Sequence, residues 1–120
     1  MNTEYEAEVA EFKRVAGELS QRIELFEEWL NTRGGNTKSS VQDVDLIFGI
    51  QREGNAWYLS VETEKGVRPV RGASLDIKIR AIHRIPSILQ AMQGSRKFLV
   101  GEMRKAIAAF DESRFLWGDQ

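Results

Sequence analysis

The stretch VDLIFGIQREGNAWYLSV, residues 44–61, contains two runs in which apolar and polar residues alternate. Side chains alternate between the two faces of a strand, so each run predicts a strand with one apolar face. The segment from Gln51 to Asn55 supplies the polar and glycine residues of a turn. The apolar faces consist of Val44, Leu46, Phe48 and Ile50 in the first strand and Trp57, Leu59 and Val61 in the second.

Upstream of this hairpin, apolar residues recur at alternating spacings of four and three, which predicts an amphipathic helix. Thr3 followed by Glu6 fits a capping box, and Gly34 with Gly35 suits the end of a helix. We therefore expect a helix over residues 4–33. The apolar stripe comprises Tyr5, Val9, Phe12, Ala16, Leu19, Ile23, Phe26 and Leu30.

The length of this helix is large for the size of the chain. About 29 helical residues would measure about 43 Å, whereas a compact chain of 120 residues has a radius of gyration of about 14 Å. The helix can therefore extend beyond the domain that it belongs to.

Downstream of the hairpin, Val67 to Arg71 is expected to form a third, shorter strand after a turn at Gly66. Pro69 cannot donate a hydrogen bond to a neighbouring strand, which places this strand at a sheet edge. Together the three strands predict an antiparallel meander over residues 41–71.

Residues 73–117 show mainly helical spacing. Alternation of Leu75, Ile77 and Ile79 would also fit a strand, but the longer helical repeat that reaches Met92 favours a helix. We expect breaks near Pro86 and Gly94, because proline removes a backbone donor and glycine commonly ends helices. The final helical stripe comprises Leu99, Met103, Ala106, Phe110 and Trp117, with Phe98 and Ile107 beside it.

The resulting expectation is a single α+β domain over residues 1–120. It consists of a long N-terminal helix, a three-stranded antiparallel meander and two or three C-terminal helices packed on the sheet. The chain is 42% hydrophobic and 29% charged, proportions typical of one globular core. It lacks cysteine, which excludes disulfides and zinc sites of the cysteine type. It also lacks a secretory signal pattern and an apolar stretch of membrane-spanning length, so we expect a cytoplasmic protein.

The formal net charge of -1 conceals two opposed regions. Residues 1–30 contain eight acids and three bases, whereas residues 65–105 contain ten bases and two acids. The basic residues could bind phosphate groups, or they could face water and complement the acidic helix within the fold or across a dimer. The candidate anion-binding residues are Arg68, Arg71, Lys78, Arg80 and Arg84.

The kind of anion is constrained by the overall charge. The sequence pI is about 5.9, and no nucleic-acid-binding motif accompanies the basic region, which argues against nonspecific DNA binding. A phosphate-bearing small molecule such as a nucleotide remains an alternative ligand.

Candidate catalytic and metal-binding residues are few. His83 is the single histidine and has no identifiable carboxylate partner in the sequence. Asp43 and Asp45 are two residues apart and could hold a hard cation, but two carboxylates more often form a polar strand entrance. We therefore expect neither enzymatic activity, nor a cofactor, nor a metal site.

The long N-terminal stripe is the stronger functional signal. It could pack on the domain's own sheet and last helix, or it could join subunits with the last helix contributing antiparallel contacts. Its length favours self-association. The candidate interface residues are Val9, Phe12, Leu19, Ile23, Phe26 and Leu30.

These patterns favour a small noncatalytic protein-interaction module that acts as a homodimer. An adaptor, an inhibitor or an accessory factor would fit, with an unidentified second protein as partner. The small size and plain composition are similar to those of accessory proteins of mobile elements, including inhibitors of host defence. The alternative is an anion-binding module that uses residues 68–84.

Overall fold

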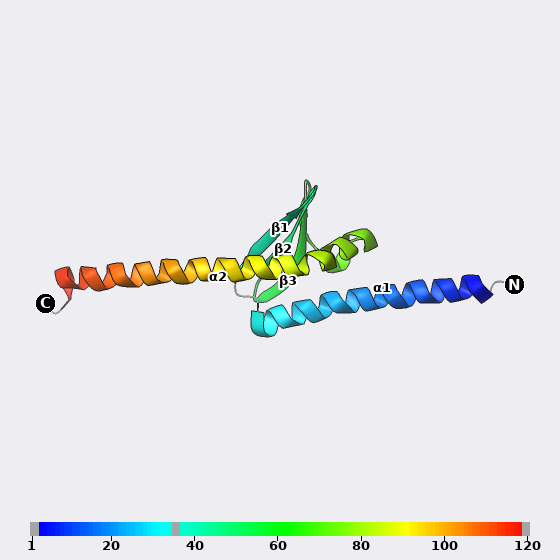
Figure 1. Cartoon of the computed structure of the whole chain (residues 1–120), viewed down its shortest axis with the longest axis horizontal. Coiled ribbons are helices and arrows are strands. Elements are labelled where there is room, and N and C mark those ends of the chain that lie inside the picture. The colour runs from blue at the N-terminus through cyan, green and yellow to red at the C-terminus, as the bar shows by residue number, and fades with distance from the viewer. Residues whose placement is uncertain (1–2, 35–36, 119–120) are drawn as a thin grey trace.

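The computed structural model describes residues 3–34 and 37–118 and shows an α+β fold with a long N-terminal helix, as expected (Figure 1). The elements in chain order are α1 (Thr3–Trp29), a π-helical turn (Leu30–Gly34), β1 (Ser39–Asp43), β2 (Leu46–Glu53), β3 (Ala56–Thr63), β4 (Gly66–Pro69), a 3-10 turn (Val70–Gly72) and α2 (Leu75–Trp117).

The sheet has four antiparallel strands in the order β1-β2-β3-β4, one more than the three that we expected. The additional strand, β1, places Ser39 and Asp43 on its buried side, so it lacks apolar alternation that would reveal it. β1 lies so close to β2 at Gly49 that a Cβ at this position would clash with the Ser39 carbonyl oxygen. The proline-containing strand β4 lies at the opposite edge, where its missing donor is harmless.

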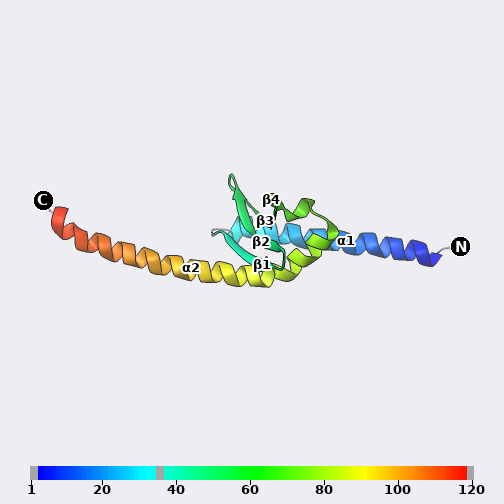
Figure 2. The same ribbon diagram turned by 90° about the horizontal axis from the view of Figure 1, so that it is seen from above.

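The prediction of two or three C-terminal helices is wrong. Residues 75–117 form one continuous helix, α2, whose start is capped by the Ser74 hydroxyl accepting from the Ile77 amide at 3.4 Å. Figure 2 shows that α2 bends within its first turns. This helix contains the exposed Pro86, which cannot donate a backbone hydrogen bond, and such a loss commonly bends a helix. Gly94 lies within the helix and does not end it.

The hydrophobic core lies between the sheet and the parts of α1 and α2 that cross the middle of the molecule (Figure 1). α2 packs under β1 and β2, whereas α1 packs against β3. The completely or almost completely buried side chains are Ile23, Leu30, Phe48, Ile50, Leu59, Val61, Val70, Ala81, Ile88 and Met92.

β4 pairs only with residues 60–63 of β3. On the same side of β3, the preceding residues bond to side chains from the end of α1. Asn31 accepts from the Trp57 amide at 2.7 Å and donates to the Trp57 carbonyl at 2.9 Å, as a neighbouring strand would. The buried carboxylate of Glu27 accepts from the Leu59 amide at 2.8 Å. The Asn31 side chain also donates to the Glu27 carbonyl at 2.8 Å, beside the local π-helical winding. These bonds fix α1 to the sheet.

Both helices extend far beyond this core, in opposite directions (Figures 1 and 2). The radius of gyration is 21.0 Å and the molecule measures 90 × 29 × 23 Å, compared with about 14 Å for the radius of a compact chain of this size. We call residues 3–18 the α1 arm, residues 93–117 the α2 arm, and the remaining described residues, 19–34 and 37–92, the domain.

Candidate protein-interaction surface

The α1 arm continues the apolar stripe that forms part of the core. Ile23 and Leu30 of this stripe are buried in the domain. About three and five turns before Ile23, Phe12 and Tyr5 occupy the same side of the helix but are each 62% exposed. The α1 arm therefore presents to solvent the side of the helix that is buried in the domain.

The α2 arm repeats this arrangement at the other end of the molecule. Ala81, Ile88 and Met92 form the buried stripe of α2 within the domain. At helical spacings of three and four the same side continues through the arm, where its large side chains are between two fifths and three fifths exposed. The arm residues on this stripe are Leu99, Met103, Ala106, Phe110 and Trp117.

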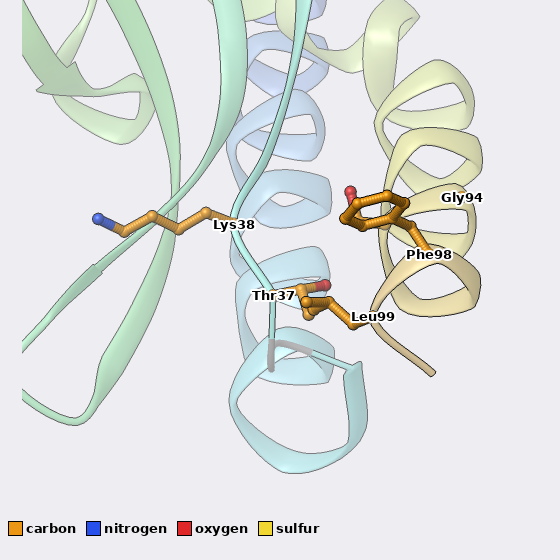
Figure 3. Close-up of a pocket in the computed structure, with 6 residues that line it drawn as sticks. Thr37, Lys38, Gly94, Phe98 and Leu99 are labelled. Carbon is orange, nitrogen blue, oxygen red and sulfur yellow. The ribbon is translucent and has the colours of Figure 1, made fainter. Parts of the chain in front are cut away.

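An open hollow of about 600 Å³ lies where the α2 arm leaves the domain. Figure 3 shows Phe98 and Leu99 reaching from α2 towards the segment at Thr37, whereas the Lys38 side chain points away. Gly94 and Ser95 complete the lining on the helix side and leave room for an approaching surface. The apolar face of the α2 arm is thus accessible from its first turn.

The two arms carry opposite charge. The α1 arm contains five acids and two bases, a net charge of -3. The α2 arm contains five bases and three acids, a net charge of +2, and four of those bases lie within residues 96–105. Arg14 of the α1 arm is engaged by Glu11 at 2.7 Å and by Glu18 at 2.9 Å, and these carboxylates raise the pKa of its guanidinium.

The structure divides the six candidate interface residues between the core and the arm. Ile23 and Leu30 are buried in the chain's own core, and Phe26 packs against it. Leu19 and Val9 are half-buried, and Phe12 is exposed. The surface open to a partner therefore begins near residue 19 on α1, and it includes the α2 stripe that was not among the candidates.

Arg80 and Arg84, two candidate anion ligands, both form ion pairs with Asp43. Arg80 donates to the Asp43 carboxylate at 3.1 Å and to its backbone carbonyl at 2.9 Å, and Arg84 donates to the same carboxylate at 2.7 Å. The bond from Arg84, followed by that from Arg80, lowers the pKa of the Asp43 carboxyl below its ordinary value. This cluster fastens α2 to the β1–β2 hairpin.

The other three basic candidates form no ion pair with Asp43 in the described residues. Lys78 donates to the Ser20 hydroxyl at 3.2 Å, which links α2 to α1, and Arg71 lies 3.6 Å from the Glu27 carboxylate. Arg68 is exposed beside a hollow that also includes Asp45 and Ser74, and it forms no ion pair with residues 3–34 or 37–118. The five side chains therefore do not converge on one site.

Asp45 and His83 lie beside the Arg80 and Arg84 side chains. Asp45 accepts from Arg80 at 3.1 Å, and the exposed His83 lines a shallow hollow beside both arginines. Across residues 3–34 and 37–118, no group of three or more histidine, aspartate or glutamate side chains is placed to hold a metal ion.

Val44 was expected on the apolar face of a strand but lies in the turn between β1 and β2. It is 87% exposed and has a φ of 55°. Glycine is usual at the first position of such two-residue turns, and a β-branched residue there is strained. Arg80 donates to residues on both sides of Val44, and Gln42 donates to the Val44 carbonyl at 3.0 Å, so the turn is held from outside.

Comparison of the sequence with protein-family models and with curated proteins, and of the fold with solved structures, gave no match. Within the described part of the chain, neither helix has the length and apolar character needed to cross a membrane. The large apolar side chains on the stripes of both arms are exposed.

Proposed function

We propose that this chain is a noncatalytic protein-interaction module, such as an adaptor, an inhibitor or an accessory factor, that binds through the apolar faces of its two arms. One observation supports this function above all others. The stripes that form the core in the domain continue into both arms, where the large side chains at Phe12 and Phe110 are more than half exposed.

The energetics of exposed apolar side chains favour a partner. Burying a large apolar side chain is worth roughly 1.5–3 kcal/mol, and contiguous apolar patches on soluble proteins commonly mark interaction sites. The α1 arm continues a helix whose other end is anchored in the domain, but its apolar side lacks the packing from which most helical stability in proteins comes. A covering surface would therefore stabilise the arms while gaining affinity from the same contacts.

The alternative of an anion-binding module gains no support from the contacts of the basic side chains. Arg80 and Arg84 are engaged by Asp43, and Arg71 lies beside Glu27. An external phosphate group would have to compete with these carboxylates for the guanidinium donors.

Native mass spectrometry of the protein purified from its own cells at low salt tests the proposed function. We expect the chain with an added protein mass, whether a second copy or a different protein. The Phe12→Glu variant should lose that mass while keeping its helical circular dichroism. Leu25→Glu is the matched control, because Leu25 is half-exposed on the opposite side of α1. A bare monomer, or equal retention of the added mass by both variants, would refute the proposal.

A further inference from the structure

We infer that the arms bind a second copy of this chain, each α1 arm packing antiparallel along the α2 arm of the partner. This inference rests on the proposed function and names the partner of the same surface. The three observations that carry it are the directions of the arms, the continuity of their stripes and their opposite charges.

The directions of the arms fit a twofold axis through the middle of the molecule. α1 runs from its free N-terminal end towards the domain, and α2 runs from the domain towards its free C-terminal end (Figure 1). A rotation of 180° about an axis perpendicular to the long dimension exchanges the two ends. It places the α1 arm of one copy beside the α2 arm of the other, with the two helices antiparallel, and it does so at both ends at once.

The stripes are suited to this pairing because their buried parts already belong to one apolar core within the domain. The α1 arm of 16 residues would measure about 24 Å and the α2 arm of 25 residues about 38 Å. The shorter arm can therefore lie wholly along the longer one, starting at the hollow beside Phe98. In this position the partner's α1 would contact the stripe of α2 beyond the part that the chain's own α1 covers.

The charges distinguish this pairing from the two symmetric ones. Pairing α1 with α1 would oppose two arms of net charge -3, and pairing α2 with α2 would oppose two of net charge +2. Pairing α1 with α2 places unlike charges opposite each other, which favours this pairing over the other two and accelerates association.

The exposed aromatic side chains can supply much of the apolar surface that a stable dimer buries. Tyr5, Phe12, Phe110 and Trp117 lie on the stripes and are each more than half exposed. At roughly 150–250 Å² for a whole aromatic side chain, these four rings hold roughly 350–600 Å² of exposed surface in each copy. Leu99 and Met103 add to this, and a standard interface buries about 800 Å² per partner.

Cysteine cross-linking tests the pairing directly, because the chain has no cysteine of its own. Val9 and Ala106 lie on the two stripes, and their replacement by cysteine is a small change. With a short bismaleimide, the Val9→Cys, Ala106→Cys double variant should give a covalent dimer on a denaturing gel. Each single variant should remain monomeric on the same gel.

The single variants also define the results that would overturn the inference. A covalent dimer from Val9→Cys alone would mean that α1 pairs with α1, and one from Ala106→Cys alone would mean that α2 pairs with α2. Either result would refute the exchanged pairing and leave the proposed function standing. If the chain is a monomer that binds a different protein through its arms, the exchanged pairing is also refuted and the proposed function stands. If it is a monomer that binds no protein, the exchanged pairing and the proposed function are both refuted.

Two sets of substitutions measure the contributions of apolar contact and charge. Phe110→Glu should raise the dimer Kd at least about 30-fold, because a buried aromatic anchor typically contributes 2 kcal/mol or more. Phe115→Glu is the matched control, since Phe115 is 87% exposed on the opposite side of the α2 arm. Equal effects of the two substitutions would contradict the pairing.

For charge, Glu4→Lys with Glu8→Lys changes the α1 arm from -3 to +1, and Arg104→Glu with Lys105→Glu changes the α2 arm from +2 to -2. Each pair of substitutions alone should weaken the dimer, and all four together should restore it. Failure of the combination to restore association would contradict the proposed pairing.

Discussion

Ile23 and Phe12 lie on one side of α1, and Ile88 and Phe110 lie on one side of α2. In the domain the isoleucines are buried, at 1% and 0% exposure, whereas in the arms the phenylalanines are 62% and 53% exposed. The stripe is the same in both regions, and only the domain supplies a sheet and a second helix opposite it. Periodicity identifies which side of a helix is suited to burial, but the surface opposite determines whether burial occurs.

The largest expected effect comes from replacing one phenylalanine in the domain and, for comparison, one in the α2 arm. Phe48→Ala should reduce the free energy of unfolding by about 3–5 kcal/mol, because it leaves a cavity in the core. Phe110→Ala should change it by less than about 0.5 kcal/mol when unfolding is followed by urea titration of the dissociated monomer. Equal losses would mean that the α2 arm belongs to the same cooperative core.

A second test concerns the link between α1 and the sheet. Glu27→Ala should cost about 1–3 kcal/mol, because it leaves the buried Leu59 amide without its acceptor. Glu28→Ala is the neighbouring control, because the Glu28 side chain is exposed and forms no hydrogen bond or ion pair with β3. Thermal unfolding of both variants would distinguish them, and similar midpoints would show that the bond from Glu27 does not anchor the helix.

The Asp43 cluster predicts a dependence of domain stability on pH. The pKa of the folded Asp43 carboxyl is lowered by Arg84 and Arg80, so its stabilising contribution is complete above the ordinary pKa of about 4. The contribution is lost as the pH falls through the lower, folded pKa. Asp43→Asn should therefore lower the thermal midpoint at pH 7 and flatten its decline below pH 4. An unchanged profile would contradict this role.

The smallest expected effect is a gain in stability at the β1–β2 turn. Val44→Gly should stabilise the domain by about 0.5–1 kcal/mol, because relief of the strain at positive φ exceeds the added entropy of the unfolded chain. Val44 is exposed, so little packing is lost. Chemical denaturation would measure the change, and a loss of stability would show that the turn is not strained.

Much of the fold follows from the sequence because its elements have clear local patterns. The hairpin predicted within residues 44–61 is present as β2 and β3, and the preference for a helix at residues 75–80 is confirmed. The edge strand predicted over residues 67–71 is present as β4, but it ends at Pro69 and residues 70–72 form a 3-10 turn. β1 could not be predicted, because its buried side carries Ser39 and Asp43, whose burial depends on β2 and α2. Pro86 was overestimated as a helix break, since apolar contacts on both sides of the bend keep α2 continuous.

The candidate sites were less predictable because they depend on contacts between distant residues. Arg80 and Arg84 meet Asp43 across 37 and 41 positions of the sequence, and no local pattern indicates that pairing. The stripe of α1 was recognised, but the boundary between its buried and exposed parts depends on where the sheet ends. The exposed stripe of α2 could have been included among the interface candidates from its spacing alone.

Sedimentation equilibrium of the full chain at low salt is the most direct test of the claim that the arms of two copies cover each other. The account predicts a mass twice the 13.7 kDa of the monomer, with dissociation as salt concentration rises and in the Phe110→Glu variant. A monomer mass at all concentrations, from a chain that retains its full helical content, would contradict it.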